Sequence, residues 1–457
     1  MDFKLLFILP DKQNKNILAI KTNKGYLVPF FDKPVGSDVE FGDSPQLYND
    51  FFRKQTGISV FRRYSFNTQH HVVFTLEQSG AIETVPENGH EWVAYDEFIA
   101  AIEDDELCKI VRSVSNNYNK SINMPWVNAG GYTHYFDWLH GICAKKNIDI
   151  NGEITQVKCA FVSTVFCVPT DTGNLYMKIP GKVYVTELPF LLKLKKLNIA
   201  QLPVWIDYDL NMNVFLMEDM GGTELPWQFD IETFKKVFIE YSKIQKRSIP
   251  HLPLNCVCND HRITTIIDKL DELPQKVSHY LAGTKYEISK QESKTFESNI
   301  KSMGVKLKTI LNTKIPNTIR CGDFRPGNIR ESKGRYIFYD WSWGSISHPF
   351  AEIPNFLHVV GANLPANIPA KDILIETYLR EWLEYGTYEQ LKSIFATFDE
   401  LTLALNWFFD DCIWLEAIYS AIDDIDPIDP MSADGCLLEK AKGSLSKSVR
   451  KFIEKDI

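Results

Sequence analysis

The chain of 457 residues contains no apolar run long enough to cross a membrane, and the apolar stretch within its first ten residues is too short for a secretory signal. Basic residues are not in excess either, because 59 Asp and Glu outnumber 50 Lys and Arg and give a formal net charge of −9. A nucleic-acid-binding surface requires an excess of basic residues, so we expect no nucleic-acid partner. The nine cysteines lack the spacing of a small disulfide-rich domain, which indicates reduced thiols in a cytoplasmic protein. Since no apolar span is found, we also expect no membrane partner.

Internal repeats, coiled-coil heptads and a glycine-rich phosphate-binding loop are also missing from the sequence. The composition that remains, 44% hydrophobic and 24% charged residues, is typical of a globular protein. A chain of this length exceeds what one hydrophobic core supports, so the sequence predicts two or three domains.

The clearest catalytic pattern is the segment 321–328, Cys-Gly-Asp-Phe-Arg-Pro-Gly-Asn. It places Asp323 and Asn328 five positions apart on a loop rich in glycine and proline, and a short apolar strand then leads to Asp340. Phosphoryl transfer from a nucleotide needs one carboxylate to accept the hydroxyl proton and further oxygen ligands to hold Mg²⁺. Asp-x4-Asn is also the spacing of the protein-kinase catalytic loop. The alternative interpretation is a turn rich in Asp and Gly between two strands.

This segment resembles the His-Gly-Asp-x-x-x-x-Asn loop and the following Asp-Trp of the aminoglycoside phosphotransferase and choline kinase superfamily. The resemblance extends over about residues 126–421. It implies an α+β fold of the bilobal protein-kinase-like type, with ATP and Mg²⁺ as cofactors. Asp323 would then be the catalytic base, and Asn328 and Asp340 would be the metal ligands.

One position departs from the family pattern. Cys321 stands where the family usually has His, and that His mainly braces the loop. The departure therefore bears on the stability of the loop more than on its chemistry. The resemblance also implies that an acidic residue near Glu352 braces the catalytic loop.

Residues 151–220 follow the pattern of a kinase small lobe. We expect two strands over 157–168 and 174–178, with Lys178 at the strand position from which kinase-like enzymes reach the nucleotide phosphates. Glu187, on the helix expected next, is the candidate partner that orients Lys178. The alternative is a surface lysine and one acidic residue among many.

Two further contacts with the nucleotide are expected in this lobe. Ser163 and Thr164 lie where kinases carry their glycine-rich loop, so their hydroxyls and backbone N–H groups are candidates for phosphate binding. An apolar strand then ends in Glu218, Asp219 and Met220 before two glycines, which resembles the hinge that reads the adenine edge. Any strand that ends in a turn would look similar.

Residues 1–112 resemble the Nudix fold, a small α/β/α domain, with its loop and helix at 36–58. A Nudix hydrolase holds metal ions with carboxylates on one face of that helix, but here the positions carry Phe51, Lys54 and Gln55. We therefore expect this domain to be non-hydrolytic. Another small α+β domain is the alternative. Residues 113–150 are expected to form a polar linker, to about 125, and a leading helix.

Residues 221–457 are expected to form a helical large lobe that contains the catalytic loop. Two side-chain groups there have open interpretations. Residues 407–416 combine aromatic and acidic side chains, which would suit a wall for a cationic or sugar substrate or a plain core helix with an acidic face. His251, Cys256, Cys258 and His261 lie close in sequence, but their spacing favours packing over a zinc site.

The sequence thus predicts an ATP-dependent phosphotransferase that acts on a hydroxyl of a small molecule. Aminoglycosides, amino sugars and choline-like amines are the acceptor classes considered, and the acidic net charge would suit a cationic acceptor. Two alternatives are a pseudokinase or regulatory nucleotide-binding protein, and a kinase whose acceptor is a peptide or protein.

Overall fold

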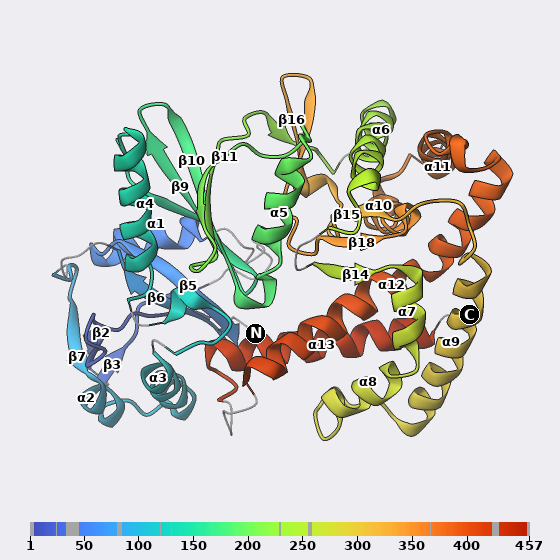
Figure 1. The fold of residues 1–457 in the computed structure, drawn as a ribbon. Helices are drawn as coiled ribbons and strands as arrows, with labels where there is room; N and C mark the ends of the chain where they lie inside the picture. Colours follow the sequence, from blue (N-terminus) through green and yellow to red (C-terminus); the bar gives the residue numbers. More distant parts are fainter. Residues whose placement is uncertain are drawn as a thin grey trace. The chain divides into compact units, whose positions relative to one another are not determined.

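The computed structural model describes residues 4–23, 25–32, 45–79, 85–118, 120–128, 130–227, 230–254, 258–365, 367–422 and 429–454 (Figure 1). The side chains of 32, 402–414, 417 and 420–422 lie outside this description. The chain divides into two compact units, and each is built from three stretches of sequence. Unit 1 comprises Met1–Val183, Trp205–Asp219 and Ile418–Glu439, and unit 2 comprises Tyr184–Val204, Met220–Ala417 and Lys440–Ile457.

The first part of unit 1 contains two sheets. One has the order β4-β1-β6-β5, in which β1 runs parallel to β6 and the other neighbours are antiparallel. The other is antiparallel and has the order β3-β2-β7. The strands are β1 (Lys4–Ile8), β2 (Asn16–Thr22), β3 (Gly25–Leu27), β4 (Phe30–Asp32), β5 (Val60–Asn67), β6 (His71–Gln78) and β7 (His90–Ala94).

Helix α1 (Gln46–Thr56) closes the core of this part. Its buried Tyr48 and Phe52 pack on Phe7 of β1 and Phe74 of β6, with ring centroids 5.1 to 5.5 Å apart. The helix ends at Gly57, which adopts φ 75° and returns its N–H to the carbonyl of Arg53. A left-handed residue at this position is the usual glycine C-cap.

The segment after this part is more ordered than a polar linker. Helix α2 (Tyr95–Ala100) precedes α3 (Asp105–Asn117), so residues 113–117 are helical and the linker expectation is wrong for them. Residues 429–434, which lie near the C-terminal end of the sequence, form hydrogen bonds with residues 113–123. Asp429 accepts from Ser113 and Asn117, and Asp434 accepts from the side chain of Ser121 and from the backbone and side chain of Asn123.

The second part of unit 1 is an antiparallel sheet with the order β11-β12-β10-β9-β8, preceded by α4 (Thr133–Lys146). Its strands are β8 (Thr155–Ala160), β9 (Ser163–Thr170), β10 (Gly173–Pro180), β11 (Trp205–Asp209) and β12 (Val214–Glu218). The single strand expected over 157–168 is therefore wrong, because the chain reverses at Phe161 and Val162. Neither residue is a glycine, proline or asparagine, the types that mark a tight turn in a sequence, so the reversal was not apparent from the sequence.

Unit 2 is mainly helical, and it also holds two small sheets of order β13-β16-β17 and β14-β18-β15. Its elements include α5 (Glu187–Lys196), β13 (Thr223–Glu224), α6 (Ile231–Ser248), β14 (Asn259–His261), α7 (Ile263–Leu270), α8 (Leu273–Leu281), α9 (Lys290–Thr309), β15 (Thr318–Arg320), β16 (Ile329–Ser332), β17 (Arg335–Phe338), β18 (Ser345–Ser347), α10 (Ile353–Val360) and α11 (Ala370–Arg380). Two long helices, α12 (Tyr388–Ile422) and α13 (Ala433–Ile453), contribute residues to both units.

Helix α6 forms as its apolar spacing predicts. Phe234, Val237, Phe238, Tyr241 and Ile244 are all buried, and Asp230 caps the first turn by accepting the N–H of Glu232. The buried face packs on α11 and on β15, the strand that leads into the segment 321–328. Helix α6 therefore packs against the strand from which the segment 321–328 begins.

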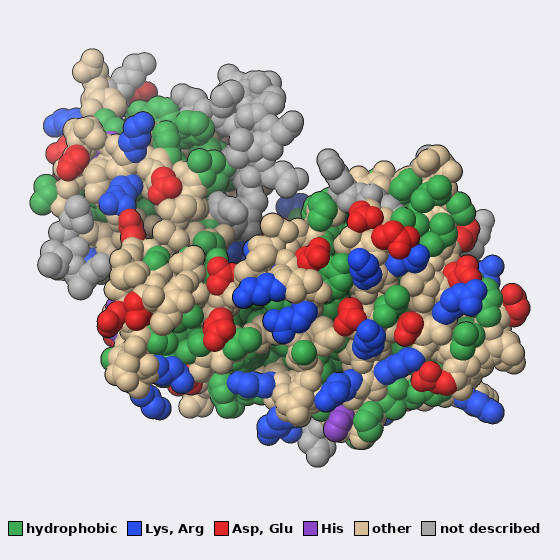
Figure 2. Space-filling view, turned by 90° about the horizontal axis from the view of Figure 1, so that it is seen from above, with side chains coloured by type: hydrophobic (Ala, Val, Ile, Leu, Met, Phe, Trp, Pro, Cys, Tyr) green, Lys and Arg blue, Asp and Glu red, His purple; other side chains and the backbone are tan. Residues whose placement is uncertain are grey.

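The surface agrees with the composition. On the face drawn in Figure 2, basic and acidic side chains are interspersed. Among the helices of the described residues, none combines the length and the apolar character that a membrane span requires.

Candidate functional site

The segment 321–328 leaves β15 and ends in a single 3-10 turn, Pro326–Asn328. The hairpin of β16 and β17 follows, with Ile329 opposite Phe338. The backbone N–H of Tyr339 donates to the carbonyl of Asn328 at 3.1 Å. This pairing returns the chain to the loop and brings Tyr339, the residue before Asp340, next to Asn328.

Asp323 and Asn328 are in direct contact. The side-chain amide of Asn328 donates to the carboxylate Oδ2 and to the backbone carbonyl of Asp323, each at 2.8 Å. The guanidinium Nε of Arg325 lies 3.0 Å from the same carboxylate oxygen, which gives the carboxylate a cationic neighbour. Asn328 is buried, and the side chain of Asp323 is about one third exposed, at 35%.

Asp340 adopts φ 58°, a left-handed conformation that costs free energy for a residue with a side chain. Its Oδ1 lies 2.5 Å from the hydroxyl of Ser342, and the same hydroxyl lies 3.3 Å from Oε2 of the buried Glu187. A hydroxyl carries one proton, so Ser342 donates to one of the two carboxylates at a time. Ser342 thus connects Asp340 to Glu187 on α5.

Gly322 makes the loop possible. It adopts φ 90°, and a Cβ built on it would lie 2.3 Å from Cβ and 2.4 Å from the carbonyl oxygen of Trp343. Any side chain at this position would displace the backbone that follows Asp340. The glycine before the candidate base is therefore required by sterics as well as by conformation.

The start of the loop is anchored by its backbone. Cys321 is buried, burial raises the pKa of its thiol well above the usual value, and its Sγ lies 3.8 Å from the carbonyl oxygen of Asp340. The N–H of Gly322 donates to Oε2 of the buried Glu352 at 3.0 Å. The expectation that an acid near Glu352 braces the loop is thereby confirmed.

The candidate nucleotide contacts are divided between the units. Lys178 lies on β10, opposite Val165 of β9 and Phe215 of β12, and its side chain is buried. Glu187 begins α5 in unit 2. The pairing of Lys178 with Glu187 stays a prediction.

Ser163 and Thr164 start β9, directly after the turn at Phe161 and Val162, and both are buried. The hydroxyl of Thr164 donates to the carbonyl of Lys158 and accepts from Gln156, so it is used inside the sheet. The hydroxyl of Ser163 has no hydrogen-bond partner in the part of the chain that the structure describes. Of the two residues, Ser163 is the better candidate for a ligand contact.

The candidate hinge follows β12. Glu218 ends the strand opposite Leu175, and the N–H of Asp219 donates to the carbonyl of Asn174. The division between the two units falls between Asp219 and Met220. These three residues stay candidates for contact with the nucleotide base.

The oxygen donors of Asp323, Asn328 and Asp340 are hard ligands, which suits Mg²⁺ rather than zinc. Among the described residues, no three or more His, Cys, Asp and Glu side chains gather into a group that could hold a metal ion. The nucleotide phosphates would have to supply the remaining oxygen ligands, as they do in enzymes of this chemistry. Of the candidate zinc cluster, Cys256 lies outside the described residues, and Nδ1 of His261 is 2.8 Å from Arg320, which favours the packing interpretation.

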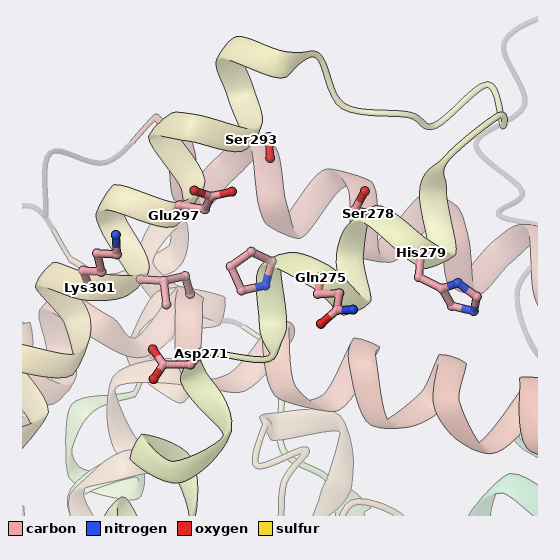
Figure 3. A pocket seen from close by; sticks show the side chains of 9 residues that line it. Asp271, Gln275, Ser278, His279, Ser293, Glu297 and Lys301 are labelled. Atoms are coloured by element: carbon pink, nitrogen blue, oxygen red, sulfur yellow. The ribbon is translucent and has the colours of Figure 1, made fainter.

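A cavity of about 600 Å³ lies elsewhere in unit 2 (Figure 3). Side chains of α8, such as Ser278 and His279, line it together with Glu297 and Lys301 of α9. None of the candidate site residues lines it, so it does not coincide with the segment 321–328.

The N-terminal domain gives a partial test of the Nudix-like expectation. The loop at 36–43 lies outside the described residues. The side chains at 407–414, considered above as a substrate wall, also lie outside them. In α1, Phe51 packs edge-on against Phe31 with ring centroids 4.6 Å apart, and Lys54 is exposed. A packed aromatic ring and an exposed ammonium cannot bind Mg²⁺, so these positions offer no metal site.

Sequence reasoning missed Ser342, Arg325 and Tyr241, which contact the candidate site through a carboxylate or a loop amide. Ser342 lies between two tryptophans and Tyr241 lies on the apolar face of a helix. Neither position carries a motif that could have identified it. Arg325 lies inside the recognised loop, where its charge was the available signal.

No family model and no curated protein matches this chain. Among solved structures, it is similar to a choline kinase from Cryptosporidium parvum Iowa II, at a TM-score of 0.47 and 12% identity over 70% of this chain and 96% of that chain. It is also similar to an ethanolamine kinase from Plasmodium vivax, at a TM-score of 0.42 and 13% identity over 74% of this chain and 94% of that chain. A choline kinase from Streptococcus pneumoniae is similar at a TM-score of 0.42 and 14% identity over 69% of this chain and 99% of that chain. Since these TM-scores lie below 0.5, the proposal below rests on the residues of the site.

Proposed function

We propose that this protein is an ATP- and Mg²⁺-dependent phosphotransferase with a protein-kinase-like fold, which transfers the γ-phosphate to a hydroxyl of a small molecule. The observation that carries the proposal is the contact of Asn328 with Asp323, together with the pairing of Asn328 with Tyr339, the residue directly before Asp340. A structural turn needs no second carboxylate at this point, and Asp340 keeps an unfavourable backbone conformation there. Strained residues of this kind gather at functional sites.

The roles follow from the contacts. Asp323, partly exposed and oriented by Asn328, would accept the proton of the attacking hydroxyl. Both donor contacts of Asn328 go to Asp323, so its carbonyl Oδ1 is the atom left for a cation. Asn328 and Asp340 would hold Mg²⁺, which neutralises charge on the transferred phosphoryl group when bound.

Unit 1 would supply groups for the nucleotide. The Lys178 ammonium would bind phosphate oxygens, Ser163 would offer its hydroxyl, and the backbone around Glu218 and Asp219 would read the base. Glu187 is proposed to hold the charge of Lys178. The acceptor would be an aminoglycoside, an amino sugar or a choline-like amine, and the acidic net charge favours a cationic one.

One observation favours a second function, a nucleotide-binding protein without turnover. Arg325 lies 3.0 Å from Oδ2 of Asp323, and a base neutralised by a guanidinium is a weaker proton acceptor. For catalysis, Arg325 would have to move away or turn toward an anionic group. Thermal stabilisation by MgATP without any turnover would support this second function.

The deciding experiment measures transfer of labelled γ-phosphate from MgATP to a panel of hydroxyl compounds that includes aminoglycosides, amino sugars and choline. Asp323→Ala should lower the rate by about 10² to 10⁴, the usual contribution of a general base. Asp372→Ala, an exposed acid in the first turn of α11, is the matched control and should keep the wild-type rate. Transfer by the Asp323→Ala variant at the wild-type rate would contradict the proposal.

A further inference from the structure

The catalytic loop rests on one tyrosine of α6. Tyr241 is fully buried, and its hydroxyl accepts the backbone N–H of Cys321 at 3.0 Å. The same hydroxyl donates to Oε2 of Glu352 at 3.1 Å, and that oxygen also accepts the N–H of Gly322. Two consecutive loop amides are therefore held by one hydroxyl and one carboxylate that also bind each other.

The ring of Tyr241 contacts the residue that follows the candidate base. It stacks on Phe324 with centroids 4.2 Å apart and planes inclined by 16°. It also contacts Phe338, the last residue of β17, at 5.7 Å. Tyr241 thus contacts the residues on both sides of Gly322 and Asp323, as well as the strand that leads to Asp340.

The protonation of this network is well defined. Burial, followed by the nearby Glu352 and Cys321, raises the pKa of Tyr241 well above its usual value, so the phenol keeps its proton. Its one proton is directed to Glu352, because the Cys321 amide can only donate. Arg320, whose Nε lies 3.6 Å from Oε2 of Glu352, supplies the opposite charge that a buried carboxylate needs.

We propose that Tyr241 is a positioning residue for phosphoryl transfer, which fixes Asp323 by anchoring the backbone before it and the aromatic ring after it. In this loop the side chain at 321 is a buried thiol, and its Sγ lies 3.8 Å from the carbonyl oxygen of Asp340. The hydroxyl of Tyr241 instead reaches the backbone of Cys321. This inference rests on the proposed function, because Tyr241 can position Asp323 for phosphoryl transfer only if Asp323 is the catalytic base.

Tyr241→Phe tests the hydroxyl while keeping the ring and its stacking. The matched control is Tyr378→Phe, because Tyr378 is also fully buried in unit 2 and its hydroxyl donates its one proton to either of two nearby acceptors, the side-chain oxygen of Gln245 or the carbonyl of Pro349. Tyr378 makes no hydrogen bond to the loop among the contacts described. The two variants should therefore lose similar stability and differ in turnover.

The first readout is release of γ-phosphate from MgATP, with water or an acceptor identified by the panel. Tyr241→Phe should lower kcat by about 10- to 100-fold, as expected for a misplaced catalytic group, and change the KM for ATP by less than about threefold. Tyr378→Phe should keep kcat within about threefold of the wild type. Equal kcat values for the two variants would overturn the inference.

The second readout does not depend on activity. Amide hydrogen exchange at Cys321 should become roughly tenfold faster in Tyr241→Phe and stay unchanged in Tyr378→Phe. If Tyr241→Phe does not fold, Glu352→Gln, which removes the charge while keeping the volume, should show the same faster exchange at Gly322. Unchanged exchange at these amides would show that Tyr241 does not hold the loop. If the wild-type protein shows no turnover at all but exchange is faster in Tyr241→Phe, the proposed function is refuted while the role of Tyr241 in holding the loop stands.

Discussion

The side-chain amide of Asn328 donates to both the carboxylate and the backbone carbonyl of Asp323, at 2.8 Å in each case. One amide therefore fixes the rotamer of the candidate base and closes the loop across five positions. Because its N–H groups are used in this way, the orientation of the amide is defined, and its oxygen faces away from Asp323. A residue that only closed a turn would not need that oxygen.

Replacing Asn328 by Ala should weaken two functions together. The variant loses the donor that orients Asp323 and the oxygen proposed to hold the cation. We expect the Mg²⁺ concentration for half-maximal turnover to rise by about 10- to 100-fold. Titration of MgCl₂ at saturating ATP measures this. Asn355→Ala, a buried asparagine of α10, is the control, and an equal shift in that variant would contradict the role of Asn328.

Ser342→Ala tests the hydroxyl shared by Asp340 and Glu187. Without it, two carboxylates lose the donor that lies 2.5 Å and 3.3 Å from them, and Asp340 loses its defined orientation. The apparent Mg²⁺ affinity should fall by about 10-fold or more. Ser345→Ala is the matched control, since Ser345 is also buried and its hydroxyl has no hydrogen-bond partner in the described part of the chain. Similar Mg²⁺ titrations for the two variants would show that Ser342 has no role at the metal.

Local sequence predicted the parts of this site that depend on short spacings. Asp323 and Asn328 meet because five residues with a proline and a glycine make one turn, and Asp340 returns because β16 and β17 form a tight hairpin. The strand and helix that carry Lys178 and Glu187 were likewise expected, from the likeness of 151–220 to a kinase small lobe. Which cation, nucleotide or acceptor these residues bind stays a prediction.

Contacts between distant residues could not be predicted in this way. Tyr241 lies 80 positions before the amide that it accepts, and Ser342 lies 155 positions after Glu187. Each of these residues looks like an ordinary core or turn residue in the sequence. The return of Asp434 to Ser121 and Asn123 has the same character, since its partners are more than 300 positions away. Such contacts follow from packing, which a single sequence does not display.

Gly322→Ala should destabilise the loop by sterics. The new methyl group would meet Trp343 at 2.3 Å, and φ 90° is unfavourable for alanine, so we expect a loss of at least about 2 kcal/mol in the free energy of unfolding. Gly334→Ala separates the two causes, because Gly334 also has a positive φ, of 74°, but nothing lies within 4 Å of the position of its Cβ. That control should lose about 1 kcal/mol. Equal losses in urea denaturation would mean that Trp343 yields to the methyl group.

The buried pair of Arg320 and His261 predicts how stability depends on pH. Burial, together with the charges of Arg320 and Lys269, lowers the pKa of His261 to about 3 from its usual 6.5. Above pH 6.5 the imidazole is neutral in both the folded and the unfolded chain, so its contribution to stability is complete there. Between pH 6.5 and 3 the unfolded chain binds a proton that the folded chain does not, and stability falls by about 1.4 kcal/mol per pH unit as the pH decreases.

His261→Gln should remove this contribution, because glutamine keeps an oxygen that can accept from Arg320 but does not titrate. Urea denaturation between pH 4.5 and 6 should give a shallower dependence of stability on pH for this variant, by about 1.4 kcal/mol per unit. The exposed His279→Gln serves as the control and should retain the dependence of the wild type. The difference in slope is diagnostic even if His261→Gln is less stable at every pH, since a lost packing contact shifts the curve without changing its slope. An unchanged slope in His261→Gln would mean that this imidazole binds its proton equally well in the folded chain, which would contradict its burial beside Arg320.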